Sequence, residues 1–246
     1  MMQYSISIKP FGVHAVLVEW PNEVDENILN DILHFKHYLS TNCLPEDQWE
    51  LVPAYNSLTL IRLSDTIDFK NFSVTLKNWY FETEKLNLKV QRYLCKLPVC
   101  YDLDFGIDLN EVAEKLKLSI RDIIKQHTEN VYRVYGIGFL PGFMYLGGLP
   151  KSLEIPRRLE PRLKVAAGSV GLASRQTGIY PQESPGGWNI IGNCSVPIFS
   201  SKREVPCLIN VGDQVQFYSI SRAEHDLHMI ESQVGIYKIE KTPINA

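Results

Sequence analysis

The chain has 246 residues and a formal net charge of −3, with 45% hydrophobic and 22% charged residues. These proportions are ordinary for a folded protein and exclude a disordered chain, a collagen-like repeat and a disulfide-rich miniprotein. A domain size of about 150 residues allows one or two domains. We predict two, a small one over residues 1–90 and a larger one over residues 91–246.

The cysteines and the N-terminus indicate a cytoplasmic protein. Five cysteines are an odd number and have no C-x-x-C spacing, which favours reduced thiols. The first residues alternate like a strand and lack the apolar core of a signal peptide. The uncharged run 134–150 is shorter than the roughly 20 apolar residues of a spanning helix, so we expect no membrane partner. A nucleic-acid partner is also not expected, because no basic binding motif is present.

The first 90 residues read as a small α+β unit. Alternating and helical periodicities follow one another in the order ββαββα. This order predicts an antiparallel sheet covered by two helices, a small α/β sandwich. The pattern places strands over 4–8 and 14–19, a helix over 22–40, strands over 50–54 and 58–63, and a helix over 65–80.

The pattern changes after residue 90. Residues 90–101 predict one long strand or a strand pair broken at Pro98. The capping boxes Asp108-x-x-Glu111 and Ser119-x-x-Asp122 predict two short helices. Beyond residue 131 no long helical period is visible, and frequent glycines and prolines predict short strands that form a barrel or sandwich. The closing strands are expected at 190–191, 196–199, 215–220 and 235–239.

Familiar catalytic motifs are absent from the sequence. It contains no dinucleotide-binding fingerprint, no phosphate-binding loop and no G-x-S-x-G nucleophile elbow. The pairs His34/His37 and His225/His228 lack a third ligand, so no metal site is predicted. His127 ends a predicted helix, where either the helix dipole or an acid–base role explains it.

A basic segment runs from Lys151 to Arg175, with six basic and two acidic residues. Prolines stiffen the backbone beside its arginines, and the guanidinium group fits a carboxylate or phosphate with two parallel bonds. Two interpretations stay open: a small anion-binding site, or structural ion pairs with neighbouring acidic residues.

Two aromatic segments flank the basic one. Phe139, Phe143 and Tyr145 lie among turn residues and form either a buried strand pair or the wall of a pocket. The sequence Ser184-Pro185-Gly186-Gly187-Trp188 predicts a tight turn with a positive φ at Gly186. Trp188 then supplies a large flat face and one N–H donor, in the core or at a site.

Four segments carry a resemblance to a known family. They closely resemble the KipI/PxpB family, which comprises the B subunits of bacterial 5-oxoprolinase and is related to allophanate hydrolase subunit 1. The resemblance implies a cyclophilin-like β-barrel after a small N-terminal domain. The segments are VCYDLDFGIDLNEVAEKLKLSIRDIIKQH (99–127), GFLPGFMYLGGLP (138–150), PRRLEPRLKVAAGSVGLASRQTGIYP (156–181) and SPGGWNIIG (184–192). Relatives carry Arg-Thr-Pro after the last segment, whereas this chain has Asn193-Cys194-Ser195.

The resemblance implies a component of a complex that hydrolyses 5-oxoproline to glutamate with ATP. Activity would need a larger KipA/PxpC-like subunit and a PxpA-like protein, and ATP would be shared with the partner. Two alternatives remain open: a regulator that inhibits a sensor histidine kinase, and an allophanate hydrolase subunit 1-like protein.

Site residues follow from this reading. The arginines are expected to converge beside two glycine turns, where backbone N–H groups stabilise a developing oxyanion. Proton transfer falls to His127 or Tyr180. The predicted catalytic residues are His127, Tyr180 and Ser169; the predicted substrate-binding or anion-binding residues are Arg157, Arg162, Arg175, Gly168, Gly186, Gly187 and Trp188; the predicted pocket wall is Phe139, Phe143 and Tyr145.

Overall fold

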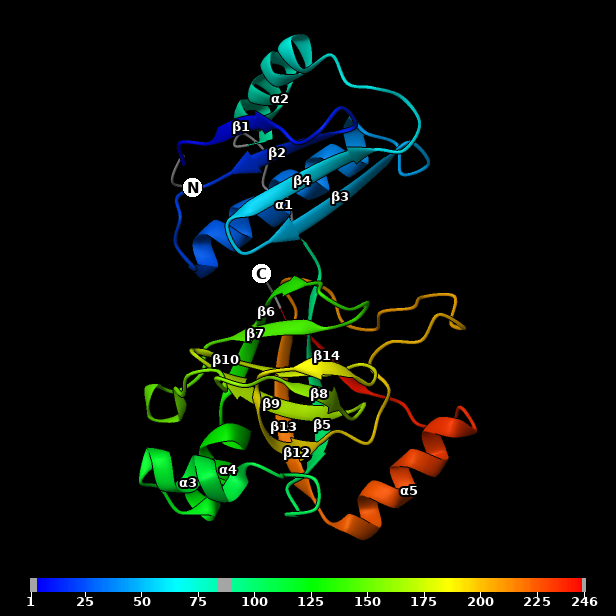
Figure 1. The fold of residues 1–246 in the computed structure, drawn as a ribbon. Helices are drawn as coiled ribbons and strands as arrows, with labels where there is room; N and C mark the ends of the chain where they lie inside the picture. The colour runs from blue at the N-terminus through cyan, green and yellow to red at the C-terminus, as the bar shows by residue number, and fades with distance from the viewer. Residues whose placement is uncertain (1–3, 84–89, 245–246) are drawn as a thin grey trace. The chain divides into compact units, whose positions relative to one another are not determined.

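The computed structural model describes residues 4–83 and 90–244. The chain divides into two compact units between Gln91 and Arg92 (Figure 1). Each unit has its own hydrophobic cluster, so each is described by itself.

The N-terminal unit is an antiparallel sheet packed against two helices. Its strands lie in the order β1 (Ser7–Pro10), β2 (Ala15–Glu19), β4 (Ser57–Arg62) and β3 (Trp49–Ala54), and its helices are α1 (Glu26–Asn42) and α2 (Phe69–Thr83). Alternate strand residues such as Val16, Val18 and Leu60 form one cluster with Phe35 of α1 and Leu76 of α2. The predicted order of elements is confirmed, because period-2 and helical apolar patterns each bury one face.

The C-terminal unit is a closed barrel. In the described part of the chain, seven strands pair in a ring in the order β12-β9-β10-β7-β6-β13-β5, which closes through a β12–β5 pairing. The ring strands are β5 (Arg92–Cys100), β6 (Val131–Ile137), β7 (Met144–Gly147), β9 (Ser169–Ala173), β10 (Gln176–Ile179), β12 (Asn189–Asn193) and β13 (Gln214–Ile220). β14 (Glu240–Ile244) adds to β5, and β8 (Arg162–Val165) pairs with β11 (Ser184–Gly186) as a separate ribbon. The predicted α+β class with a C-terminal barrel is confirmed.

Two short helices follow β5, as the capping boxes predict. They are α3 (Leu109–Leu116) and α4 (Ile120–Glu129). The Ser119 hydroxyl accepts a hydrogen bond from the Asp122 backbone N–H at 3.0 Å, which is the expected cap. Asp108 makes no such cap, although it stands at the N-terminus of α3. Its carboxylate instead accepts hydrogen bonds from other residues, and these bonds hold the candidate site together.

The C-terminal region departs from prediction at three places. Residues 222–233 form a helix, α5 (Arg222–Gln233), begun by a capping box between Ser221 and Glu224. The helix was missed because it has no apolar stripe: His225 is its buried residue, while Leu227 and Ile230 are more than half exposed. The strand predicted over 196–199 is reduced to one bridge between Phe199 and Cys207. The last strand begins at Glu240 instead of 235.

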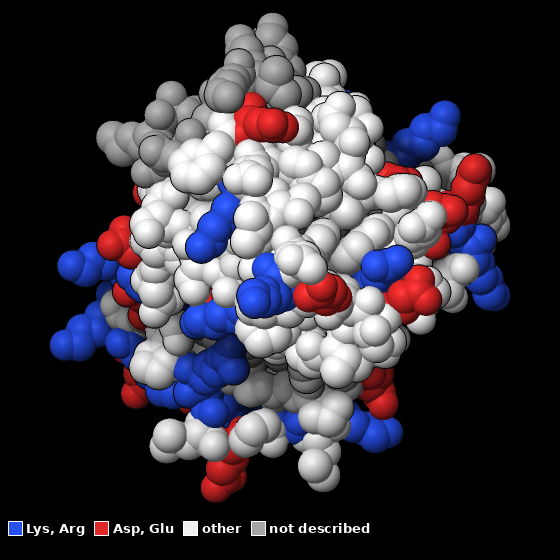
Figure 2. Space-filling view, turned by 90° about the horizontal axis from the view of Figure 1, so that it is seen from above, with Lys and Arg blue, Asp and Glu red and all other residues white. Residues whose placement is uncertain are grey.

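Charge is dispersed on the face of the molecule shown in Figure 2. Uncharged residues cover most of this face, and Lys and Arg are interspersed with Asp and Glu. None of the helices in the described ranges is long and apolar enough to cross a membrane.

Candidate functional site

A buried carboxylate connects the basic segment to the barrel. Asp108 is 2% exposed and accepts hydrogen bonds from Arg158 Nη1 at 2.9 Å, from Arg162 Nη1 at 2.9 Å and from the Ile190 backbone N–H at 2.7 Å. Arg162 Nη2 also donates to Asp108, so that this pair is bidentate. Arg158 donates a further bond to Glu111 at 2.8 Å. We call these residues, Asp108, Glu111, Arg158 and Arg162, the Asp108 cluster.

The Asp108 cluster corrects the prediction of converging, free arginines. Arg162 does lie beside Gly186, its partner in the β8–β11 ribbon, but its guanidinium group is already neutralised by Asp108. Bonds to Lys115 and then to Arg158 lower the pKa of Glu111 to about 2, so this carboxylate also stays charged. The ion-pair interpretation therefore holds for Arg158 and Arg162, with acidic partners about 50 residues away in sequence.

Trp188 lies directly before the strand that Asp108 anchors. It is 5% exposed, and its ring centroid lies 5.3 Å from that of Phe143, which in turn contacts Tyr145 and Tyr180 edge to face. The Arg157 guanidinium carbon lies 5.9 Å from the Trp188 ring centroid, at cation–π range. Arg157 makes no ion pair among the described residues. Its exposed guanidinium group therefore carries an unpaired positive charge next to the Trp188 ring.

The predicted pocket wall is mostly core. Phe143 is fully buried and Tyr145 is half-buried, both within a cluster that includes Tyr180 and Trp188. Phe139 is 66% exposed at a φ of 68° and contacts only the edge of this cluster through Phe143. These side chains form an aromatic cluster in which one ring, that of Phe139, is exposed. Their role as the wall of a pocket stays a prediction.

Tyr180 contacts both glycine segments that were predicted to supply oxyanion-binding N–H groups, Gly168-Ser169 and Gly186-Gly187. Its backbone pairs with one: the Gly168 N–H donates to Tyr180 O at 2.7 Å, and the Tyr180 N–H donates to Ser169 O at 2.9 Å. Its hydroxyl lies against the other, since a Cβ on Gly186 would stand 2.3 Å from Tyr180 Oη. Burial raises the pKa of Tyr180, so the phenol is protonated near neutral pH.

The glycine segments differ from the predicted oxyanion turns. Gly186 lies in β11 without a positive φ, and the close approach of Tyr180 explains why it is glycine. Gly168 does have a positive φ, of 79°, but its N–H is bonded to Tyr180 O, and the N–H of the buried Ser169 is bonded to Ala166 O. Neither of these two N–H groups is free to bind an oxyanion.

Arg175 does not join the other predicted residues. It lies in the exposed turn between β9 and β10, at the opposite end of β9 from Gly168. Six residues of extended chain span roughly 20 Å. Arg175 therefore does not lie beside Gly168, whereas the bridge between Ile155 and Ser174 brings its turn next to the segment that carries Arg157. A common anion-binding pocket for Arg157, Arg162 and Arg175 stays a prediction.

His127 lies inside the barrel core instead of facing a site. Its side chain is fully buried, with Nδ1 2.7 Å from the Tyr101 hydroxyl and Nε2 2.9 Å from Thr177 Oγ1. The ring stacks on Phe217 at a centroid distance of 4.6 Å. Burial lowers the pKa of His127 to about 3. The geometry gives this residue a structural role, and proton transfer by it stays a prediction.

We expect His127 to make the protein acid-sensitive. Because its pKa is lowered in the folded state, the unfolded chain binds a proton that the folded chain does not, between about pH 6.5 and about pH 3. Stability should fall as the pH falls through this window, by up to about 1.4 kcal/mol per pH unit from this group. Urea unfolding at several pH values checks it: the slope should be shallower in His127→Gln and unchanged in the exposed-residue control His37→Gln. Equal slopes in all three proteins would refute the assignment.

A pocket lies between the barrel and α5. It measures about 250 Å³ and takes in two predicted residues, Gly168 and Tyr180, as well as Asn193 and Ser195. Met229, Ser232 and Gln233 of α5 form its other wall. We call it the α5-side pocket. Arg157, Arg158, Arg162 and Arg175 do not line it.

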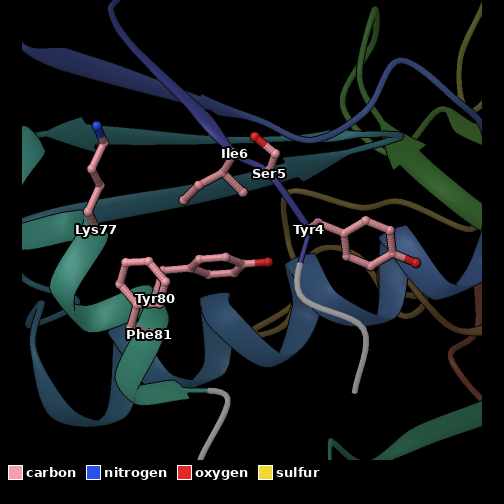
Figure 3. Close-up of a pocket in the computed structure, with 6 residues that line it drawn as sticks. All are labelled: Tyr4, Ser5, Ile6, Lys77, Tyr80 and Phe81. Carbon is pink, nitrogen blue, oxygen red and sulfur yellow. The ribbon is translucent and has the colours of Figure 1, made fainter.

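The N-terminal unit has a pocket of its own. It measures about 440 Å³, with Lys77, Tyr80 and Phe81 from α2 on one side and residues 4–6 before β1 on the other (Figure 3). The Tyr80 hydroxyl donates to the buried Asp31 at 2.5 Å, so this side chain is part of the core. No predicted site residue lies here. Among the described residues no group of three or more His, Cys, Asp or Glu side chains is placed to hold a metal ion.

Sequence reasoning missed Asp108 and His225. Asp108 was assigned to a helix cap, because its partners Arg158 and Arg162 are 50 and 54 positions away and have Glu154 and Glu160 as nearer acidic neighbours. His225 is buried and contacts Asn193 Oδ1 through Nε2 at 2.9 Å, which fixes α5 on the barrel. Only the fold brings His225 and Asn193 together, since they are 32 positions apart.

Comparison with known proteins agrees with this architecture. Residues 6–209 match the family model described as carboxyltransferase domain, subdomain C and D. The chain is 34% identical to the B subunit of 5-oxoprolinase from Bacillus subtilis (strain 168), over 94% of this chain and 100% of that protein. It is 40% identical to the B subunit of 5-oxoprolinase from Escherichia coli O157:H7, over 68% of this chain and 76% of that protein.

A solved structure shows the same fold. The urea carboxylase of Kluyveromyces lactis superposes with a TM-score of 0.79 at 20% identity, over 98% of this chain and 24% of that one. The match of the family model over most of the chain and the identities to B subunits lead to one conclusion. The chain belongs to the family of carboxyltransferase subdomains C and D that includes the 5-oxoprolinase B subunits.

Proposed function

We propose that this chain is the B subunit of a 5-oxoprolinase, a complex that hydrolyses the lactam of 5-oxoproline to glutamate with ATP. The observation that carries the proposal is 34% identity to the B subunit of a 5-oxoprolinase along that protein's whole length. The chemistry is consistent with it. A lactam is a stable amide, and activating its oxygen needs cationic groups and donors placed where negative charge develops.

Several groups that were predicted to bind phosphate are engaged within the chain. Arg158 and Arg162 are held by Asp108 and Glu111, and the N–H groups of Gly168 and Ser169 are bonded within the chain. We therefore assign the nucleotide contacts chiefly to a larger partner subunit of the KipA/PxpC type, with a PxpA-like protein completing the complex.

This chain's contribution to the reaction is a rigid, charged surface. The Asp108 cluster fixes residues 156–164 against the strand that follows Trp188. Arg157 then stands over the Trp188 ring, with its charge free for an anionic group of the substrate or of the partner. Tyr180 and Phe143 support the ring from behind.

The isolated chain should show negligible 5-oxoproline-dependent ATP hydrolysis. Turnover should appear when it is co-expressed with the larger subunit and the PxpA-like protein, because the sequence has no phosphate-binding loop and Arg158 and Arg162 are paired within the chain. Phosphate release with and without 5-oxoproline measures both states. Robust turnover by the chain alone would contradict the assignment of the nucleotide contacts to the partner subunit. If the full complex released no phosphate in response to 5-oxoproline, 5-oxoproline would not be the substrate.

A second candidate rests on the family description. The same fold also occurs in the urea carboxylase of Kluyveromyces lactis, and the family model is described as a carboxyltransferase domain. An allophanate hydrolase subunit 1-like role is tested by supplying allophanate to the same complex. Inhibition of a sensor histidine kinase stays a third prediction, tested by adding the chain to an autophosphorylation assay.

A further inference from the structure

Exposed apolar side chains gather on α5 and directly after it. Leu227 and Ile230 of the helix, Val234 at its C-cap and Ile236 beyond it are each more than half exposed. Residues three or four positions apart are neighbours on a helix surface, so the first three of these side chains lie next to one another. Contiguous exposed apolar groups of this kind mark interaction sites.

A second exposed segment contacts α5. Leu103 and Ile107, in the loop between β5 and α3, are half exposed or more. Phe105 of the same loop lies against the helix, with its ring centroid 4.4 Å from that of His225 and 4.3 Å from the Arg222 guanidinium carbon. The loop and α5 therefore form one surface at the rim of the barrel (Figure 1). We define the outer α5 surface by its exposed apolar residues, which are Leu103, Ile107, Leu227, Ile230, Val234 and Ile236.

The outer α5 surface is fixed within the chain. Near the start of the helix, His225 Nε2 lies 2.9 Å from Asn193 Oδ1 of the barrel. At its end, Gly235 has a φ of 77° and the Ile236 N–H donates to Glu231 O at 2.9 Å, as in a Schellman motif. The exposed apolar groups are therefore held in place before a partner binds, which lowers the entropy cost of association.

The charge around these apolar groups is acidic. Residues 102–107 and 221–236 carry a single basic side chain, Arg222, and five acidic ones, which are Asp102, Asp104, Glu224, Asp226 and Glu231. A two-fold dimer joins a surface to its own copy, and like charges would then face each other at a cost in free energy. The charge therefore disfavours a second copy of this chain. It fits a partner with basic residues around an apolar groove.

The size of the surface favours the same partner. A helix of 12 residues is about 18 Å long and about 10 Å wide, so its outer side covers on the order of 200 Å². A stable, specific interface takes about 800 Å² from each protein. Even with the loop added, the surface is too small to hold two copies together by itself. It suits one part of a longer contact with a large protein.

We propose that the outer α5 surface is a docking site for the larger subunit of the complex, which covers it with an apolar groove edged by basic residues. The inference rests on the proposed function, because it takes the chain to be one subunit of a complex. It goes further by naming the part of this chain that the larger subunit contacts and the chemistry of the contact.

Binding is measured between the full chain and the purified larger KipA/PxpC-like subunit of the same organism. The double variant Leu227→Gln/Ile230→Gln should weaken binding at least about tenfold, because it places amide groups in an apolar contact. Val74→Gln is the matched control: Val74 of α2 is 59% exposed, like Ile230, and the variant should bind like the parent chain. Thermal melts confirm that each variant is folded, which is expected since the changed side chains are exposed.

A charge variant tests the basic edge of the groove. Asp104→Lys should slow association with the larger subunit, because opposite charges on two proteins steer them together. Asp104 is 83% exposed, so the change leaves the barrel core untouched. Association that is unchanged or faster would overturn the assignment of a basic partner surface.

The outcomes separate this inference from the proposed function. Equal binding by the parent chain and the folded double variant would overturn the docking site alone, and the proposed function would stand. If the parent chain did not bind the larger subunit, both would be wrong. Light scattering of the isolated chain tests the other occupant: a dimer that the double variant loses would make a second copy the partner at this surface and overturn the proposal.

Discussion

Asp108→Asn should lower the free energy of unfolding by about 3 kcal/mol. Removing one partner of a buried ion pair costs about 3–5 kcal/mol, because the remaining charge is left without compensation. The lower end applies here, since the side chains of Arg158 and Arg162 are each 26% exposed and regain some hydration. The Ile190 N–H would also lose its carboxylate acceptor. Urea unfolding of the variant and the parent chain measures the difference.

Asp104→Asn is the matched control for this change. Asp104 is 83% exposed and its contact with Arg222 at 3.5 Å is a surface pair, so the expected change is below about 1 kcal/mol. A double-mutant cycle of Asp108→Asn with Arg162→Ala should show strong coupling, because each single change already breaks the bidentate pair. If Asp108→Asn unfolded at the same urea concentration as Asp104→Asn, the Asp108 cluster would not be the anchor of the basic segment.

Trp188→Ala should cost about 3–5 kcal/mol of stability, the usual range for truncating a buried tryptophan. The side chain is 5% exposed and packs against Phe143, Tyr145 and the Arg157 guanidinium group. In the assembled complex, the same change should reduce activity more than it reduces complex formation, since Arg157 loses its support. Thermal melts and ATP hydrolysis with 5-oxoproline measure the two effects.

Two further variants serve as controls for Trp188→Ala. His37→Ala, at an exposed position of α1, should melt like the parent chain. Trp188→Phe should retain most of the stability, because a phenyl ring still fills the contact with Phe143. Equal melting temperatures for Trp188→Ala and His37→Ala, together with equal complex activity, would show that no structured site exists at Trp188.

Local patterns determined much of the fold. The ββαββα order of the N-terminal unit is visible in alternating and helical apolar spacing, because each element buries one face of its own. The cap at Ser119 is equally local, since donor and acceptor are three residues apart. α5 was not predicted because it has no such local apolar pattern. Its contact with the barrel is made by a polar residue, His225, and the helix has no apolar stripe on that side.

The sequence by itself determined the order of the elements in the N-terminal unit, the barrel class of the C-terminal unit, the family segments and the list of candidate residues. Tertiary structure decided what those residues do. Arg158 and Arg162 became internal ion pairs because Asp108, 50 and 54 positions away, is carried to them by the β12 contact, and a long-range pairing of charges leaves no mark on local spacing. Likewise, His127 became a core residue, because the strands that bear Thr177 and Phe217 close around it, and strand pairing over such distances leaves no mark on the sequence near His127.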